Sequence, residues 1–296
     1  MPTIRIIGPG RAGRSLACAL AGAGWEVLPL VGRGEDVRDA ASGVDALVIA
    51  TPDDAVAATA QAVRPHPGAV VLHLAGSLGL DVLAPHARRA ALHPLVAMPD
   101  PAIGAQRLAS GISFAVAGDP FARAVVDALG GCALEVPDHA RPAYHAAAVI
   151  AANHLVGLLG QVERVAGSVG LPLDAFLPLA RCALEDAGRV GPRRALTGPA
   201  ARGDWETLRR HLDAIDTSEH PGYRAGVGLA LALAVAPYEE AAGRQAAARA
   251  EGAGPVEAAE PAGVRQAVQA EAVDVAEAVD VAEAVDVAEA VEALSG

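Results

Sequence analysis

A glycine-rich segment near the start of the chain has the pattern of a site for a phosphate-containing ligand. Its residues are Gly8-Pro9-Gly10-Arg11-Ala12-Gly13, a GxGxxG sequence that directly follows an apolar run. Between a strand and a helix, the first glycine makes the turn, the second admits a pyrophosphate, and the third packs the helix on the strand. The pyrophosphate then lies at the positive N-terminal end of the helix. The pattern predicts dinucleotide binding through Gly8, Gly10, Arg11, Ala12 and Gly13, with a purely structural turn as the alternative.

The end of the second predicted strand distinguishes two nicotinamide cofactors. A site for NAD places an acidic residue there, about 20 residues after the glycines, to hold the ribose 2′-hydroxyl. This chain has Arg33 in that place, and a guanidinium suits a 2′-phosphate. We therefore expect NADP. Glu35 and Asp36 follow closely and keep NAD as an alternative, and a solvated Arg33 without a ligand is another.

Three further predicted strands end in small or polar residues. Thr51-Pro52-Asp53, Ala75-Gly76-Ser77 and Leu92-His93-Pro94 follow the third, fourth and fifth strands. Ligands bind at such strand ends in open α/β sheets, so we expect Thr51, Pro52 and Ser77 to border the nicotinamide. His93 is expected to donate a proton or a hydrogen bond to substrate, with a structural hydrogen bond as the alternative. Asp53 is also able to cap the next helix, and His73 is expected to be a core histidine.

The second half of the chain places polar residues inside apolar helical segments. The first segment contains Tyr144, His145, Asn153 and His154. His145 and Asn153 are eight residues apart, about 80° on a helical wheel, so they share one face. An amide buried in so apolar a stretch needs partners, which substrate or the nicotinamide carboxamide would supply. We therefore expect His93, Asn153 and His145 to form the catalytic set.

The segment from Gly191 to Asp204 combines two Gly-Pro pairs with three arginines. Arginine binds carboxylates and phosphates bidentately. We expect Arg202 or Arg194 to contact an anionic group, and we assign Arg202 and Thr197 to substrate binding. The alternative is a helix connector whose arginines pair with Glu185, Asp186 or Asp204. Asp204 is also expected to cap the helix that follows it.

Hydrophobic patterning divides the chain into an α/β half and a helical half. Up to about residue 138, short β-rich runs alternate with helical stretches, as in βαβ units on a parallel sheet. The predicted strands are Thr3–Ile7, Trp25–Val31, Ala46–Ala50, Ala69–Leu74, Ala90–Leu92 and Ile112–Ala117, and the helices include Arg11–Ala23, Asp53–Val63 and Pro120–Leu129. Later segments are alanine-rich and helical, at about 139–170, 172–189, 204–215 and 217–249, the last capped by Thr217 or Ser218.

These patterns predict three regions. Residues 1–138 form a doubly wound, mostly parallel Rossmann domain, and residues 139–250 form an all-α substrate and dimerisation domain. Residues 251–296 contain eleven acidic residues and one base, so this tail carries −10 of the net charge of −12. The tail repeats Glu-Ala-Val-Asp-Val-Ala three times from Glu271. Its valines form no helical stripe, so we expect disorder or a frayed helix.

Composition excludes several classes of function. All 23 basic residues are arginine, which excludes a lysine Schiff base and the lysine of a Walker A loop. The near-neutral body predicts no nucleic-acid partner. The three cysteines form no CxxC pair, so we expect buried thiols and no metal site. The most apolar stretch, Ala225–Pro237, is too short to span a bilayer, so we expect a soluble, cytoplasmic protein without a membrane partner.

Several motifs together resemble a known family. In chain order they are GxGxxG at 8–13, Leu92-His93-Pro94-Leu95, Tyr144-His145-Ala146-Ala147-Ala148, Asn153, and Ala195-Leu196-Thr197-Gly198-Pro199 with Arg202-Gly203-Asp204. Over about residues 2–245 the chain resembles Rossmann-like proteins whose C-terminal half is domain of unknown function 2520. These are distantly similar to pyrroline-5-carboxylate reductase, deazaflavin-dependent NADP reductase and 6-phosphogluconate dehydrogenase-like proteins. The resemblance implies a nicotinamide-binding domain, a helical domain that commonly dimerises, and an active site between them.

One departure from the wider group restricts the resemblance. Its ketopantoate reductases and β-hydroxyacid dehydrogenases use a helical-domain lysine as proton donor, and this chain has no lysine. Its proton would come from His93, His145, His154, water or the substrate. We predict an NADP-dependent oxidoreductase that transfers a hydride between nicotinamide and a small anionic carbonyl, imine or alcohol. The alternatives are a non-catalytic NADP(H)-binding sensor or regulatory protein, and a structural protein acting through its acidic tail.

Overall fold

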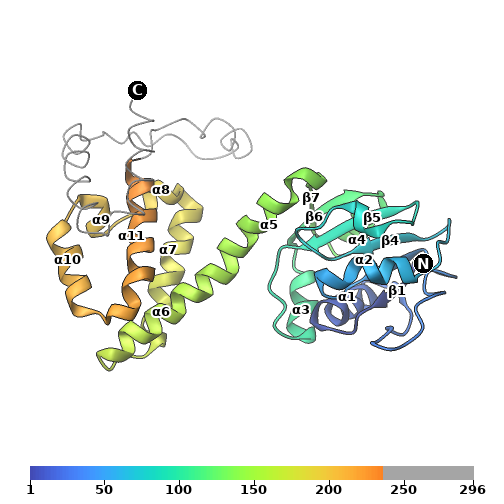
Figure 1. Cartoon of the computed structure of the whole chain (residues 1–296), viewed down its shortest axis with the longest axis horizontal. Coiled ribbons are helices and arrows are strands. Elements are labelled where there is room, and N and C mark those ends of the chain that lie inside the picture. Colours follow the sequence, from blue (N-terminus) through green and yellow to red (C-terminus); the bar gives the residue numbers. More distant parts are fainter. Residues whose placement is uncertain (236–296) are drawn as a thin grey trace. The chain divides into compact units, whose positions relative to one another are not determined.

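The computed structural model describes residues 1–235 (Figure 1). The predicted tail at 251–296 and the end of the last predicted helix lie outside the described residues. The chain divides into two compact units, Met1–Leu155 and a second unit that begins at Val156. The first contains the predicted α/β domain and the second contains helices, so the expected fold class is confirmed.

A seven-stranded sheet forms the centre of the first unit. Its strands are β1 (Thr3–Ile7), β2 (Glu26–Val27), β3 (Ala46–Ile49), β4 (Val70–His73), β5 (Arg89–Pro94), β6 (Ser113–Gly118) and β7 (Cys132–Glu135). Their order is β2-β1-β3-β4-β5-β6-β7, and only the β5–β6 pair is antiparallel. The chain passes from β1 to β2 on one side and later to β3 on the other. This change of direction makes the β1/β3 boundary the topological switch point, where such sheets bind ligands.

The strands are buried on both faces because alternate residues enter two different cores. Ile4 and Ile6 pack in one core with α1 (Arg11–Gly22), α3 (Pro101–Leu108) and α4 (Phe121–Ala128). Ile7 packs in the other core with α2 (Asp53–Ala62) and the 3₁₀ turn η1 (Leu80–Leu83). Covering both faces explains why these strands are continuous apolar runs, and Figure 1 shows the helices around the sheet.

Several details of the first unit differ from the sequence expectations. The predicted strand at Trp25–Val31 is reduced to β2 and one bridge between Val31 and Ile7, with Pro29, which has no N–H to donate, in between. Strand β7 and helix α3 were not predicted. Asp53 does not cap α2, because Pro52 occupies the cap position. The three cysteines are exposed rather than buried.

The first unit extends past the expected boundary at residue 138. It includes the 3₁₀ turn η2 (Asp138–Ala140), helix α5 (Arg141–Val149) and the π-helical turn η3 (Ile150–His154). Residues of η2 and α5 hydrogen-bond to Ala75 on the loop after β4, to Leu80 at the start of η1 and to His93 in β5. These contacts join the start of the helical half to the α/β unit.

The second unit is helical throughout its described part. Its helices are α6 (Leu155–Ser168, which begins one residue before the unit), α7 (Leu177–Val190), α8 (Pro192–Ala195), α9 (Pro199–Arg202), α10 (Trp205–Ala214) and α11 (His220–Val235), with 3₁₀ turns η4 (Leu173–Ala175) and η5 (Thr217–Glu219). The Asp204 carboxylate accepts the Thr207 N–H, which confirms the predicted cap. The predicted caps at Thr217 and Ser218 are wrong, because Asp216 caps η5 and α11 begins after it.

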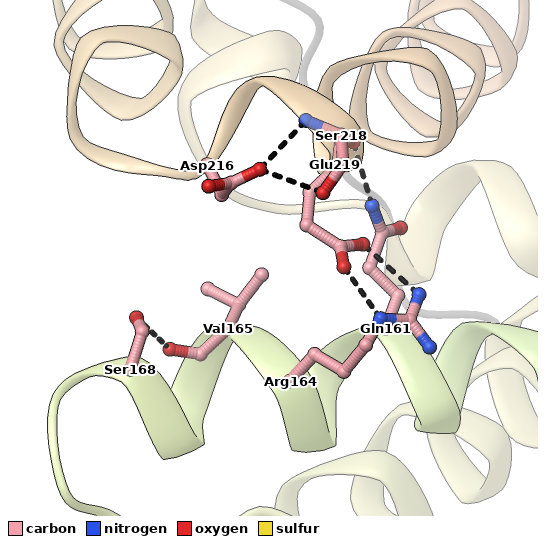
Figure 2. A network of polar contacts seen from close by, with 7 residues as sticks. All are labelled: Gln161, Arg164, Val165, Ser168, Asp216, Ser218 and Glu219. Carbon is pink, nitrogen blue, oxygen red and sulfur yellow. Dashed lines mark hydrogen bonds and ion pairs between the residues drawn. The ribbon is translucent and has the colours of Figure 1, made fainter.

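A polar network joins α6 to η5 (Figure 2). Arg164 forms a two-contact ion pair with Glu219, and the Gln161 amide donates to the Glu219 carbonyl at 2.8 Å. Asp216 accepts hydrogen bonds from the backbone and hydroxyl of Ser218. The Arg164 side chain is largely solvent-accessible, so the ion pair itself contributes little stability and mainly sets which helices meet.

One helical stretch is long and apolar. Asp138–Ser168 has a mean hydropathy of 1.3 over its most apolar part, none of which is buried within the chain. By length and composition it meets the requirement for a membrane-crossing helix, a weak criterion that helices of soluble proteins also meet. Exposed apolar side chains on this stretch include Ile150, Val156 and Leu158.

Candidate functional site

A pocket of about 530 Å³ lies at the topological switch point of the sheet. Its lining comes from the ends of β1 and β3, the turn after Val31, and α2. Predicted cofactor residues in the lining are Gly8, Gly10, Arg33, Thr51 and Pro52. Arg11, Ala12 and Gly13 begin α1 directly beside it, whereas Ser77 is not in the lining and lies on the loop after β4.

The three glycines of the pattern have three different physical requirements. Gly8 has φ +106°, and a Cβ there would lie 2.5 Å from the Ala50 carbonyl oxygen, so the turn excludes other residues. A Cβ on Gly13 would collide with the Gly8 carbonyl oxygen, which confirms close packing of α1 on the turn. A Cβ on Gly10 would meet nothing within 4 Å. Gly10 therefore borders open space, as expected for a residue that admits a ligand.

The turn after Val31 separates its arginine from its acidic residues. The Gly32 N–H donates to the Glu35 carboxylate at 2.7 Å, and the Arg38 N–H donates to Asp36 at 2.9 Å. Arg33 is exposed and lines the pocket. Glu35 also lines it, but its carboxylate already holds the turn around Arg33. The cation is therefore the better placed group to bind a ligand.

Thr51 has a hydroxyl that is left without a partner. Its Oγ1 is buried and forms no hydrogen bond to any described residue. Buried polar groups in proteins are almost always hydrogen-bonded. Thr51 immediately follows β3 and contributes to the pocket lining. Its hydroxyl is thus a candidate hydrogen-bonding group for a ligand that fills this pocket.

A second polar cluster lies at the ends of β4 and β5. His93 Nδ1 and the Tyr144 hydroxyl are 2.6 Å apart and hydrogen-bonded. The His145 ring lies edge-on to His93, with 5.7 Å between their centroids. Beneath both rings is Gly76, where a Cβ would collide with His145 and lie 3.0 Å from His93 Nε2. The structure thus brings together the predicted His93 and His145 and adds Tyr144 and Gly76.

Burial determines the protonation states of the hydrogen-bonded pair. Desolvation lowers the pKa of His93 to about 4, helped by the nearby His145, Arg141 and His73. Desolvation raises the pKa of Tyr144 to about 12, partly opposed by the charge of Arg141. At neutral pH the imidazole is therefore neutral and the phenol is protonated. Hydrogen-bond donation by His93 is favoured over proton donation from an imidazolium.

Three side chains hold the loop that connects β4 to η1. Arg141, which is fully buried, donates from Nη2 to the Ala75 carbonyl at 3.0 Å. The Leu80 N–H donates to Asp138 at 2.9 Å. The ring of His73 is bonded through Nε2 to the Gly79 carbonyl at 3.2 Å, and its side chain is fully buried, as expected for a core histidine. Gly76 and Ser77 lie between these anchor points.

Asn153 does not have the environment expected for it. The residue is exposed within this chain rather than buried. It belongs to the π-helical turn Ile150–His154, so the wheel angle of a regular α-helix does not relate it to His145. Single π turns are frequent at functional sites. Its expected role toward substrate stays a prediction, and His154 in the same turn is exposed as well.

Thr197 and Arg202 belong to the second unit. The two Gly-Pro pairs begin the single-turn helices α8 and α9, with positive φ at Gly191 and Gly198. Thr197 lies between these helices and Arg202 ends α9, and both are exposed. The acid Asp186 pairs with Arg189, three residues further along α7. Substrate binding by Thr197 and Arg202 stays a prediction.

Sequence reasoning missed Arg141, and it expected Gly76 only as part of the Ala75-Gly76-Ser77 segment at a strand end near the nicotinamide. Neither residue belongs to a recognisable motif, because Arg141 opens an alanine-rich helix and Gly76 follows an ordinary strand. Their roles come from contacts between segments distant in sequence. In the part of the chain that the structure describes, no three His, Cys, Asp or Glu side chains are grouped to hold a metal ion.

Comparison with known families agrees with this architecture. Residues 112–228, which extend from the sheet into α11, match the family described as a domain of unknown function, DUF2520. The similarity to DUF2520 covers this part of the chain. This match confirms the resemblance drawn from the motifs. The DUF2520 region begins at β6 and includes α5 and the exposed Asn153. No curated protein matches the chain in sequence.

Several solved structures with a similar fold are described as reductases or oxidoreductases. BF3122 from Bacteroides fragilis, provisionally classed as an NADP oxidoreductase, has 20% identity and a TM-score of 0.64 over 79% of this chain and 98% of its own. Reductive aminase from Aspergillus terreus, in complex with NADPH4, cyclohexanone and allyl amine, has 16% identity and a TM-score of 0.59 over 84% and 95%. Plasmodium falciparum pyrroline carboxylate reductase with NADP bound has 12% identity and a TM-score of 0.53 over 79% and 98%. At these identities the likeness concerns the fold.

Proposed function

We propose that this DUF2520 protein is an NADP-dependent oxidoreductase that transfers a hydride to or from a small carbonyl, imine or alcohol. The observation that carries the proposal is the switch-point pocket, which joins the GxGxxG turn to an exposed Arg33. The acids of the same turn already accept backbone hydrogen bonds. Three of the similar structures, which belong to two proteins, are described with NADP or a form of NADPH, and this supports the same cofactor here.

The residues of the pocket fit a dinucleotide phosphate. The open space beside Gly10 lies at the N-terminal end of α1, whose first turn contains no acidic residue. Backbone N–H groups and the helix dipole both favour an anion at this place. Arg33 would bind the 2′-phosphate, and the unpaired Thr51 hydroxyl would donate to or accept from the ligand. When bound, the cofactor supplies or accepts the hydride.

The His93–Tyr144 pair is suited to donate the accompanying hydrogen bond or proton. If Nδ1 of His93 accepts from the phenol, its Nε2–H is a donor on the side of Gly76. If Nδ1–H donates instead, the phenolic proton is available. Either tautomer offers one N–H or O–H group to a carbonyl oxygen or imine nitrogen. This donor replaces the lysine of the wider group and needs no charged imidazole.

The remaining parts of the proposal concern the substrate and the assembly. An anionic group on the substrate would be held by Arg202 and Thr197, and Asn153 and His145 would orient the reacting part. A homodimer through the helical region would cover the apolar side chains exposed on Asp138–Ser168. The expected setting of such an enzyme is the cytoplasm, without nucleic-acid or membrane partners.

A fluorescence titration with NADPH and NADH tests the cofactor assignment. The wild-type chain is expected to bind NADPH more tightly than NADH. Arg33→Ser should weaken NADPH binding roughly 10- to 100-fold, the value of a charge-assisted contact, and leave NADH binding unchanged. Arg38→Ser is the matched control, because Arg38 is an exposed arginine of the same loop outside the pocket lining. Failure of both dinucleotides to bind below millimolar concentration would refute the proposal.

Turnover is tested separately from binding. NADPH oxidation is followed with a panel of small keto acids, imines formed in solution, and aldehydes. Activity that falls in Tyr144→Phe with unchanged NADPH affinity supports the enzyme. Tight NADPH binding without turnover on any member of the panel would instead favour a sensor or regulatory protein on the same scaffold.

A further inference from the structure

Arg141 is a buried cation with incomplete hydrogen bonding. Its side chain is fully buried, and only Nη2 has a partner, the Ala75 carbonyl at 3.0 Å. The Nε and Nη1 atoms are buried and form no hydrogen bond to any residue in 1–235. Burying a charge without full pairing is costly, and an apolar side chain of similar volume often makes a protein more stable. Stability therefore does not account for this arginine.

The groups that face Arg141 come from four elements. They are His73 on β4, His93 on β5, Asp138 on η2 and Tyr144 on α5, and His145 in turn faces His93. Asp138 is the acidic group among them, but its carboxylate accepts the Leu80 N–H. Within the described chain Arg141 makes no ion pair. Its positive charge is thus not neutralised by contact.

The single hydrogen bond of Arg141 is made at the position that supports the two imidazoles. Ala75 directly precedes Gly76, on which the rings of His93 and His145 rest. A shift of the Ala75 carbonyl would move Gly76 and change the space available to both rings. Arg141 also belongs to the same helix as Tyr144 and lies one turn before it. One side chain thus connects the support of His93 to the helix that carries its hydrogen-bond partner.

We propose that Arg141 is a positioning residue for the His93–Tyr144 pair, which anchors the end of β4 beneath the imidazoles and opposes a second positive charge on His93. The proposal deepens the proposed oxidoreductase function and rests on it, because the pair is the expected proton or hydrogen-bond donor. The electrostatic part follows from burial. The charge of Arg141 has no neutralising ion-pair partner among the described residues, and it acts strongly on His93 because water is excluded there. The anchoring part follows from the contact with Ala75.

The experiment compares Arg141→Met with Arg141→Lys in the full chain. Methionine removes the charge and retains apolar volume, whereas lysine retains the charge. Arg89→Met is the matched control, because Arg89 is half-buried and, like Arg141, donates to a backbone carbonyl, that of Leu80, at the other end of β5. The imidazole resonances of His93 are followed by NMR as a function of pH, with His93→Gln used for assignment. NADPH affinity and thermal unfolding are recorded for each variant.

The titration midpoint of His93 is expected to rise above about 4 in Arg141→Met and to stay below 6.5, because burial, the largest cause of the low pKa, remains. Arg141→Lys should keep most of the wild-type shift, and Arg89→Met should not change the midpoint. Arg141→Met should unfold at the wild-type temperature or above it and retain NADPH affinity. An unchanged His93 midpoint in Arg141→Met would overturn the proposal. If Arg141→Met does not fold, a wild-type midpoint in Arg141→Gln, which also removes the charge, would overturn it equally.

These readouts separate the positioning role from the proposed function. The NMR titration requires no substrate and no turnover, so it gives an answer even if the chain binds no dinucleotide. If turnover is found, the acid side of the kcat/KM profile in Arg141→Met should move in the same direction as the His93 midpoint. A profile that stays in place while the midpoint moves would refute the catalytic part alone.

Discussion

Lowering the pH from about 8 to about 5 should destabilise the first unit through two buried histidines. Desolvation lowers the pKa of both His73 and His93 from 6.5 to about 4. The unfolded chain therefore binds more protons than the folded chain between pH 6.5 and 4. Stability rises with pH in this window, is fully present above pH 6.5, and is lost as the pH falls.

The size of the effect follows from the two pKa values. For a group that titrates at 6.5 when unfolded and about 4 when folded, linkage gives a loss of about 2 kcal/mol at pH 5. Two such groups lose at most about 4 kcal/mol, because the charge of His73 is itself one of the causes that lower the pKa of His93. This is a large part of the stability of an ordinary domain, about 5–15 kcal/mol. Carboxylates titrate mainly below this window.

The decrease in unfolding free energy is measured by urea unfolding, with tryptophan fluorescence as the signal. The two tryptophans lie one in each unit, so a Trp205→Phe background leaves Trp25, which packs edge-on against Phe121, as the reporter of the first unit. His93→Asn should reduce the pH dependence by about 2 kcal/mol. Any pH-independent destabilisation caused by the substitution itself cancels when the unfolding free energy at pH 5 is subtracted from that at pH 8. An unfolding free energy that is the same at both pH values would refute the assignment of buried neutral histidines.

Four further substitutions have distinct expected outcomes. Gly8→Ala should destabilise the first unit by about 2 kcal/mol or more, because φ at Gly8 is positive and the added Cβ meets a backbone oxygen. Gly10→Ala should unfold like wild type but lose NADPH affinity at least 10-fold. Equal unfolding midpoints for the two variants would contradict this contrast. Tyr144→Phe, which removes the 2.6 Å contact with His93, should lower kcat about 100-fold with NADPH affinity unchanged, and unaltered kcat would exclude the pair from the reaction. Gly76→Ala should displace the imidazoles of His93 and His145 and destabilise the first unit by about 1–3 kcal/mol. Denaturation measures the stability, and chemical-shift changes at His93 report the displacement. Unchanged chemical shifts would show that the rings do not pack against this residue.

The features predicted well from sequence are those determined by neighbouring residues. The turn at Gly8–Gly13 and the start of α1 follow from backbone requirements of six consecutive residues. The Asp204 cap follows from a contact with a residue three positions further along the chain. The apolar runs at β1, β3, β4 and β6 identified buried strands because both faces of the sheet are covered. The position of Arg33 beside the pocket was predictable because the first βαβ unit has a regular length.

The features that sequence reasoning missed or misplaced depend on contacts between distant segments. His93 and Tyr144 are 51 residues apart, and Arg141 and Ala75 are 66 apart. The antiparallel pairing of β6 with β5 reflects how the chain crosses the sheet after α3. Asn153 was expected to be buried because its neighbours are apolar. Apolar neighbours indicate that a helix tends to pack against another apolar surface, but they do not show that this surface belongs to the same chain.

The class of fold, the dinucleotide-binding turn and the exclusion of lysine chemistry can all be read from the amino-acid sequence. These depend on composition and on the geometry of a few consecutive residues. The folded arrangement was needed to show which polar groups meet at the strand ends, that the acids beside Arg33 already have partners, and that Arg141 is buried without an ion-pair partner among the described residues. Such pairings result from the packing of whole elements, in which many small contributions combine and no single motif is diagnostic.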